Sequence, residues 1–218
     1  TMEDPEQKDR PRARWPMSPR REVPLIQLLP NLMTIGALCA GLMAIRLGAA
    51  GRFPEAVALI LVAALLDGLD GRVARFLKSE SPMGAELDSL ADFLNFGAAP
   101  GLLISFWAFP GRPDIGLGAA VIYVVCTVLR LARFNVGNAA AAALSRQGRF
   151  QGVPSPAGAL LSMLPLYLHY LWPSWPNLPE PVVAVWLVFV GVLMISPFGT
   201  PSLKSVRVPT EKASFAVV

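Results

Sequence analysis

The chain has 218 residues, of which 54% are hydrophobic and only 16% are charged. A soluble domain of this size normally carries about 25% charged residues, so the composition excludes an ordinary soluble globular protein and indicates that lipid is the solvent. The net charge is +4, but the basic residues flank apolar segments, which favours contact with anionic lipid headgroups and argues against nucleic-acid binding.

Residues 1–22 are rich in proline and carry charges of both signs. This composition predicts a disordered segment or one that lies on the membrane surface. A single helical domain is expected over residues 23–204, followed by a cytoplasmic tail over residues 205–218.

Six apolar stretches follow the N-terminal segment, and each is long enough to cross a bilayer as a helix of roughly 20 residues. They cover residues 31–50, 54–77, 85–108, 115–134, 155–172 and 181–197. The stretches lack the strict alternation of barrel strands. The sequence therefore predicts an all-α membrane protein with six transmembrane helices.

Lysine and arginine are distributed unevenly between the two sides of this topology. Of the nineteen basic residues, only Arg46, Arg52 and Arg112 fall on one side, and the remaining sixteen fall on the side that holds both termini. The positive-inside rule then places both termini in the cytoplasm of a cell whose inner membrane holds the protein.

Six of the fifteen acidic residues lie between Asp67 and Asp92. Asp67 and Asp70 share one face of a helix, and Asp88 and Asp92 share one face of the next helix, because residues three or four apart are neighbours on a helix surface. A short connection makes the two helices antiparallel neighbours. We therefore expect four carboxylates at the cytoplasmic ends of the second and third helices.

Four carboxylates near a membrane need compensation, because repulsion and desolvation oppose their ionisation. Oxygen ligands of this kind suit two divalent cations, Mg²⁺ or Mn²⁺. Gly71, Ala74 and Gly84 leave room for a bulky polar ligand, and Arg75 is able to pair with phosphate. The alternative is that the aspartates pair with Arg72 and Arg75 as interfacial anchors.

These residues resemble the signature of the CDP-alcohol phosphotransferase family, D-x2-D-G-x2-A-R-x8-G-x3-D-x3-D. The chain matches it at Asp67, Asp70, Gly71, Ala74, Arg75, Gly84, Asp88 and Asp92. Further segments, at residues 29–34, 92–100, 148–158 and 202–204, are similar to integral-membrane phosphatidylserine synthases. The chain departs from that subfamily at Asn95, where serine is more common, and over residues 197–201, which lack an expected basic residue.

The resemblance implies a role for each matching residue. Asp67, Asp70 and Asp88 would hold the metal ions, with Asp92 near one of them. Asp92 would also act as general base, and Asp88 would belong to the catalytic set. The CDP pocket would be lined by Asn31, Thr34, Asp70, Gly71, Ala74, Arg75 and Gly84. The implied substrates are CDP-diacylglycerol and L-serine, the products are phosphatidylserine and CMP, and the implied assembly is a homodimer in membrane lipid.

The carboxylate of serine needs a basic partner. Arg130 and Arg133, near the cytoplasmic end of the fourth span, are candidates, and Arg149 and Lys204 are weaker ones. The alternative is that these four residues only satisfy the positive-inside bias.

Two competing interpretations remain. The first keeps the chemistry and changes the acceptor to glycerol phosphate, inositol phosphate or choline, or the donor to an ether lipid. The second is a divalent-cation transporter, which would place acidic residues near the bilayer midplane and on both structural repeats. The single cluster at one end disfavours transport.

Overall fold

A computed structural model of the chain describes residues 28–144, 153–174 and 178–196, with side chains up to residue 137 in the first range. The described residues form helices and contain no strand. The elements are α1 (Leu29–Ala49), α2 (Phe53–Leu77), α3 (Pro82–Asp92), η3 (Phe93–Ala98), α4 (Ala99–Ala108), α5 (Pro113–Leu144), α6 (Ser155–Ser162), α7 (Leu164–Leu171) and α8 (Glu180–Ile195). The predicted terminal segments, residues 1–22 and 205–218, lie outside these ranges.

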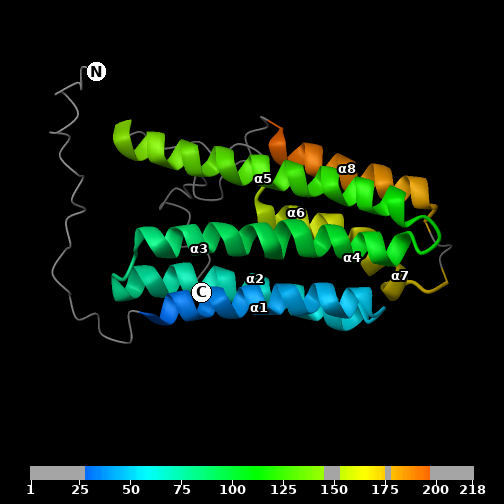
Figure 1. The fold of residues 1–218 in the computed structure, drawn as a ribbon, viewed down its shortest axis with the longest axis horizontal. Coiled ribbons are helices and arrows are strands. Elements are labelled where there is room, and N and C mark those ends of the chain that lie inside the picture. Colours follow the sequence, from blue (N-terminus) through cyan, green and yellow to red (C-terminus); the bar gives the residue numbers. More distant parts are fainter. Residues whose placement is uncertain (1–27, 145–152, 175–177, 197–218) are drawn as a thin grey trace, which may run out of the picture.

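The long helices lie side by side as a bundle (Figure 1). α1 packs along α2, and α5 packs along α8, with α4 and η3 between these pairs. The beginning of α1, the end of α2 and the beginning of α3 meet at one end of the bundle, at the left in Figure 1. The four motif aspartates, two on α2 and two on α3, therefore lie toward this end of the molecule, whereas Glu55 lies in the first turn of α2.

Three helical stretches in the described part of the chain are long and apolar enough to cross a membrane. They are Leu29–Ala49, Pro82–Ala108 and Pro113–Gly137, and they correspond to the first, third and fourth predicted spans. α8 is apolar but shorter. α2 has 25 residues, but its second half carries both aspartates and two arginines, which lowers its hydropathy.

The region predicted as a fifth continuous span, residues 155–172, is divided into α6 and α7. The division falls at Met163, and Pro165 occupies the first turn of α7. Proline has no backbone N–H and clashes with the preceding turn, so a helix ends before it. The predicted fifth span is therefore made of two short helices in the structure. The fourth predicted helix is longer than expected, because α5 ends at Leu144 rather than near residue 134.

The third predicted span contains a π-helical turn, η3. A π turn accommodates one extra residue and changes the direction in which the following side chains point. The hydroxyl of Tyr123 donates a 2.8 Å hydrogen bond to the carbonyl oxygen of Phe96, and Gly97 packs closely against Thr127 of α5. The π turn thus lies directly after Asp92 and is held against α5.

Candidate active site

The site forms where a tight connection turns α2 into α3. Lys78 ends α2 in the left-handed conformation, with a φ of 50°. The side chain of Ser81 accepts a 3.0 Å hydrogen bond from the backbone N–H of Gly84, and Pro82 occupies the first turn of α3. Such an N-cap fixes where the helix begins. The faces of α2 and α3 that carry the motif are therefore held next to each other.

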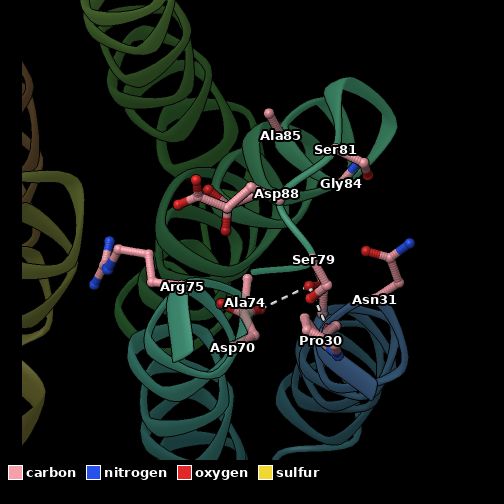
Figure 2. A pocket seen from close by; sticks show the side chains of 13 residues that line it. Pro30, Asn31, Asp70, Ala74, Arg75, Ser79, Ser81, Gly84, Ala85 and Asp88 are labelled. Atoms are coloured by element: carbon pink, nitrogen blue, oxygen red, sulfur yellow. Dashed lines mark hydrogen bonds between the residues drawn. The ribbon is translucent and has the colours of Figure 1, made fainter. Parts of the chain in front are cut away.

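A pocket of about 230 Å³ opens at this end of the bundle, between α1, α2 and α3 (Figure 2). It is lined by Pro30, Asn31, Thr34, Asp70, Gly71, Ala74, Arg75, Ser79, Glu80, Ser81, Gly84, Ala85 and Asp88. The structure thus brings all seven residues predicted to bind CDP, together with Asp88, to one cavity. Asp67 and Asp92 lie outside its lining.

Thr34 of α1 fixes the carboxylate of Asp70 of α2. Its hydroxyl lies 2.7 Å from Oδ2 of Asp70 and 3.0 Å from the carbonyl oxygen of Pro30. Asp70 is only 3% exposed. Its other oxygen, Oδ1, is buried and has no hydrogen-bond partner among the described residues. One carboxylate oxygen is therefore held in place while the second is free for a ligand.

The glycines of the motif shape the pocket in two different ways. A Cβ atom added at Gly84 would lie 3.0 Å from Oδ1 of Asn31 and 3.1 Å from Oγ of Ser81, so the close approach of α1 and α3 favours glycine here. A Cβ atom at Gly71 would meet no atom within 4 Å. Gly71 therefore leaves open space on the pocket wall, where a ligand is able to approach the backbone.

The four motif carboxylates form one electrostatically connected group. Asp67 and Asp92 are direct neighbours, and the charges of Asp88 and Asp70 act on both of them. Oδ1 of Asp67 is buried and, within the described ranges, has no hydrogen-bond partner. The positive charge of Arg130 attracts Asp92. The carboxylates of α2 and α3 therefore face a common region.

The residues at this site fit a divalent cation in kind. Asp67 and Asp70 each present a buried carboxylate oxygen without a partner among the described residues, and such hard oxygen donors suit Mg²⁺ or Mn²⁺. The carboxylates do not converge on one point, however. In the described part of the chain, no three His, Cys, Asp or Glu side chains are close enough together to bind one ion.

The candidate acceptor residues differ in their surroundings. Arg130 is partly buried, and its Nη1 donates a hydrogen bond to Oγ of Ser155. Arg133 is exposed, and its Nη1 donates a 2.9 Å hydrogen bond to the carbonyl oxygen of Ile195. Arg149 and Lys204 lie outside the described residues. The structure therefore brings Arg130 near the acidic group, while Arg133 contacts the end of α8.

Several lining residues were not singled out from the sequence. They are Pro30, Ser79, Glu80, Ser81 and Ala85. Three of them occupy the connection between α2 and α3, where the family signature has no fixed residue type. A serine followed by a proline, as at Ser81 and Pro82, is typical of the beginning of a helix and could have located this turn. Arg75 is exposed, and its guanidinium points away from the α1 side of the pocket (Figure 2).

Known proteins have similar sequences. The chain is 41% identical over 202 residues to a CDP-diacylglycerol–serine O-phosphatidyltransferase of Mycobacterium leprae, with 91% of this chain and 66% of that protein covered. It is 35% identical to the enzyme of the same name from Helicobacter pylori, with 84% of this chain and 75% of that protein covered. The chain thus spans slightly less than two thirds of the mycobacterial relative.

A solved structure has a similar fold. It is the Mycobacterium tuberculosis phosphatidylinositol phosphate synthase with CDP-DAG bound, with a TM-score of 0.56, 22% identity, and coverage of 79% of this chain and 86% of that one. The profile described as CDP-alcohol phosphatidyltransferase matches residues 27–196, a range that includes the pocket and all four aspartates. The resemblance inferred from the motif is confirmed, and the chain belongs to the CDP-alcohol phosphatidyltransferase family.

Proposed function

We propose that this protein transfers the phosphatidyl group of CDP-diacylglycerol to L-serine, which yields phosphatidylserine and CMP. The observation that carries the proposal is the pocket that gathers the motif residues of α1, α2 and α3 next to four connected carboxylates. The names of the relatives from Mycobacterium leprae and Helicobacter pylori support serine as the acceptor.

The proposed topology has six membrane spans in the inner membrane, with both termini and the pocket on the cytoplasmic side. The uneven distribution of basic residues supports this orientation, and the three long apolar helices support the membrane location. A homodimer and a catalytic domain over residues 23–204 are further parts of the proposal and rest on the family resemblance.

In the proposed reaction, the hydroxyl oxygen of serine attacks the phosphorus that carries the lipid. The bond between that phosphorus and the CMP oxygen breaks, and CMP leaves. Asp92 accepts the hydroxyl proton, and such a general base typically contributes about a hundred- to ten-thousandfold to the rate.

Asp67, Asp70 and Asp88 would hold two divalent cations, with Asp92 close to one of them. When bound, such cations neutralise the charge of the diphosphate and of the leaving group. The open wall at Gly71 and Ala74 would receive the nucleotide, and Thr34 would hold Asp70 in place. Positioning of the reactants by these residues is a major source of rate in phosphoryl transfer.

One assay tests the proposal and its alternatives. Purified protein is incubated with CDP-diacylglycerol and Mg²⁺ or Mn²⁺, and CMP release is measured with L-serine, glycerol phosphate, inositol phosphate and choline. We expect CMP release that depends on serine. CMP release with only one of the other alcohols would identify that alcohol, and not serine, as the acceptor. The same assay with an ether-lipid analogue of CDP-diacylglycerol tests the identity of the donor. Absence of CMP release with each acceptor would favour the cation transporter.

A further inference from the structure

The side chain of Ser155, at the beginning of α6, has a contact that the family signature does not explain. Ser155 is completely buried, and its Oγ accepts a hydrogen bond from Nη1 of Arg130 on α5. It lies between Pro154 and Pro156, and Pro154 has an extended backbone with φ −56° and ψ 144°. Because proline restricts the backbone on both sides, the Ser155 hydroxyl is held in a defined position.

Arg130 has unused hydrogen-bonding capacity at this position. A guanidinium offers five N–H donors in a rigid fork. Ser155 accepts from Nη1, whereas Nε is buried and has no hydrogen-bond partner within the described part of the chain. A buried donor without a partner is unfavourable. An anion that accepts hydrogen bonds from the guanidinium edge would remove this cost.

Arg130 also lies within electrostatic reach of Asp92. The two charges attract each other, but the ion pairs among the described residues do not include a direct contact between them. The guanidinium is therefore near the carboxylate proposed to accept the serine proton, without being neutralised by a contact ion pair. A second anion is able to bind the same cation.

We propose that Ser155 is a positioning residue that holds the guanidinium of Arg130 to receive the α-carboxylate of the acceptor amino acid. The inference rests on the proposed function and adds the means by which the acceptor class is chosen. Guanidinium and carboxylate match as a planar pair of parallel hydrogen bonds. Carboxylate binding at Arg130 would direct the hydroxyl of the same molecule toward Asp92.

The test compares L-serine with L-serinamide, in which a neutral amide replaces the carboxylate. We expect wild-type protein to prefer L-serine in kcat/KM. In Ser155→Ala, this preference falls about tenfold, which corresponds to about 1.4 kcal/mol, mainly through a higher KM for L-serine, because the guanidinium is no longer held in place by the hydroxyl. The KM for CDP-diacylglycerol stays unchanged. In Arg130→Lys the preference falls further, because lysine lacks the planar fork.

Two further variants separate positioning from folding. Ser155→Thr keeps a hydroxyl and retains most of the preference. Ser162→Ala removes another fully buried serine of α6, whose hydroxyl donates to Ala159 within the same helix, and it leaves the preference unchanged. Equal losses for both acceptors in Ser155→Ala overturn the inference and leave the proposed function intact. Wild-type protein that releases CMP only with an alcohol other than serine overturns the proposed function itself.

Discussion

The hydroxyl of Thr34 lies 2.7 Å from Oδ2 of Asp70 and connects α1 to α2 at the floor of the pocket. The two residues are 36 positions apart in sequence, and both are buried. The same hydroxyl is 3.0 Å from the carbonyl oxygen of Pro30, so it has two possible acceptors for one hydrogen. An ionised Asp70 is the stronger acceptor, and Thr34 therefore orients the carboxylate that the family signature requires.

Thr34→Val should raise the concentration of Mg²⁺ or Mn²⁺ that gives half-maximal activity by about tenfold. Loss of a hydrogen bond to a metal-binding carboxylate commonly weakens metal affinity by about 10- to 100-fold. Thermal unfolding in detergent with increasing Mn²⁺ provides a second measurement, in which the variant should need more Mn²⁺ for the same stabilisation.

Thr127→Val is the matched control for this substitution. Thr127 is also buried, but its hydroxyl donates to the carbonyl oxygen of Tyr123 within its own helix. The Thr127→Val variant should need the same concentration of Mg²⁺ or Mn²⁺ as the wild type. Thr34→Ser, which keeps the hydroxyl, should lie close to the wild type as well. An unchanged metal requirement in Thr34→Val would show that the Thr34 hydroxyl does not act through the metal-binding carboxylates.

Asp92→Asn should reduce turnover by about a hundred- to ten-thousandfold, because the amide is unable to accept the proton of the acceptor hydroxyl. Binding of CDP should be largely retained, since Asp92 lies outside the pocket lining, and binding of Mn²⁺ should be largely retained because Asp67, Asp70 and Asp88 remain as ligands. Single-turnover CMP release and calorimetric CDP binding measure the two effects separately. Glu86→Gln removes an exposed carboxylate from the same helix and should leave turnover unchanged. Retained turnover in Asp92→Asn would remove Asp92 from the role of general base.

Gly71→Leu should raise the KM for CDP-diacylglycerol at least tenfold while the protein remains folded. A Cβ atom at Gly71 meets no protein atom within 4 Å, so the added side chain occupies space that a ligand would otherwise use. Gly118→Leu places the same side chain at an α5 position that is also open but does not line the pocket. Both variants should unfold at similar temperatures in detergent. Equal KM values for the two would contradict nucleotide binding along this wall.

The apolar runs and the spacing of the motif were sufficient to predict much of the helical structure and the residues around the pocket. Helical periodicity alone places Asp67 with Asp70, and Asp88 with Asp92, on shared faces. The hydrogen bond between Arg130 and Ser155 was not predictable, because the two residues are 25 positions apart and meet only through the packing of α6. Apolar composition likewise gave no signal for the π turn at Phe93–Ala98, whereas the break at Met163 was signalled only by Pro165.

Asn95, which lies in that π turn, packs against Gly41 of α1. The residue is fully buried in η3, and neither its Oδ1 nor its Nδ2 has a hydrogen-bond partner among the residues that the structure describes. A Cβ atom added at Gly41 of α1 would lie 2.1 Å from Oδ1 of Asn95. The amide thus occupies space that exists because residue 41 is glycine, so the two positions depend on each other.

Gly41→Ala should destabilise the protein by about 1–3 kcal/mol, the typical cost of an added methyl group in a packed core. Asn95→Ala should cost much less, because it removes a buried polar group that makes no hydrogen bond to the described residues. The double variant should be more stable than Gly41→Ala alone, because the smaller side chain at position 95 makes room for the added methyl group. Thermal unfolding of all four proteins in the same detergent gives the coupling between the sites. Additive losses would mean that α1 and η3 adjust independently, and the two residues would then not be a matched pair.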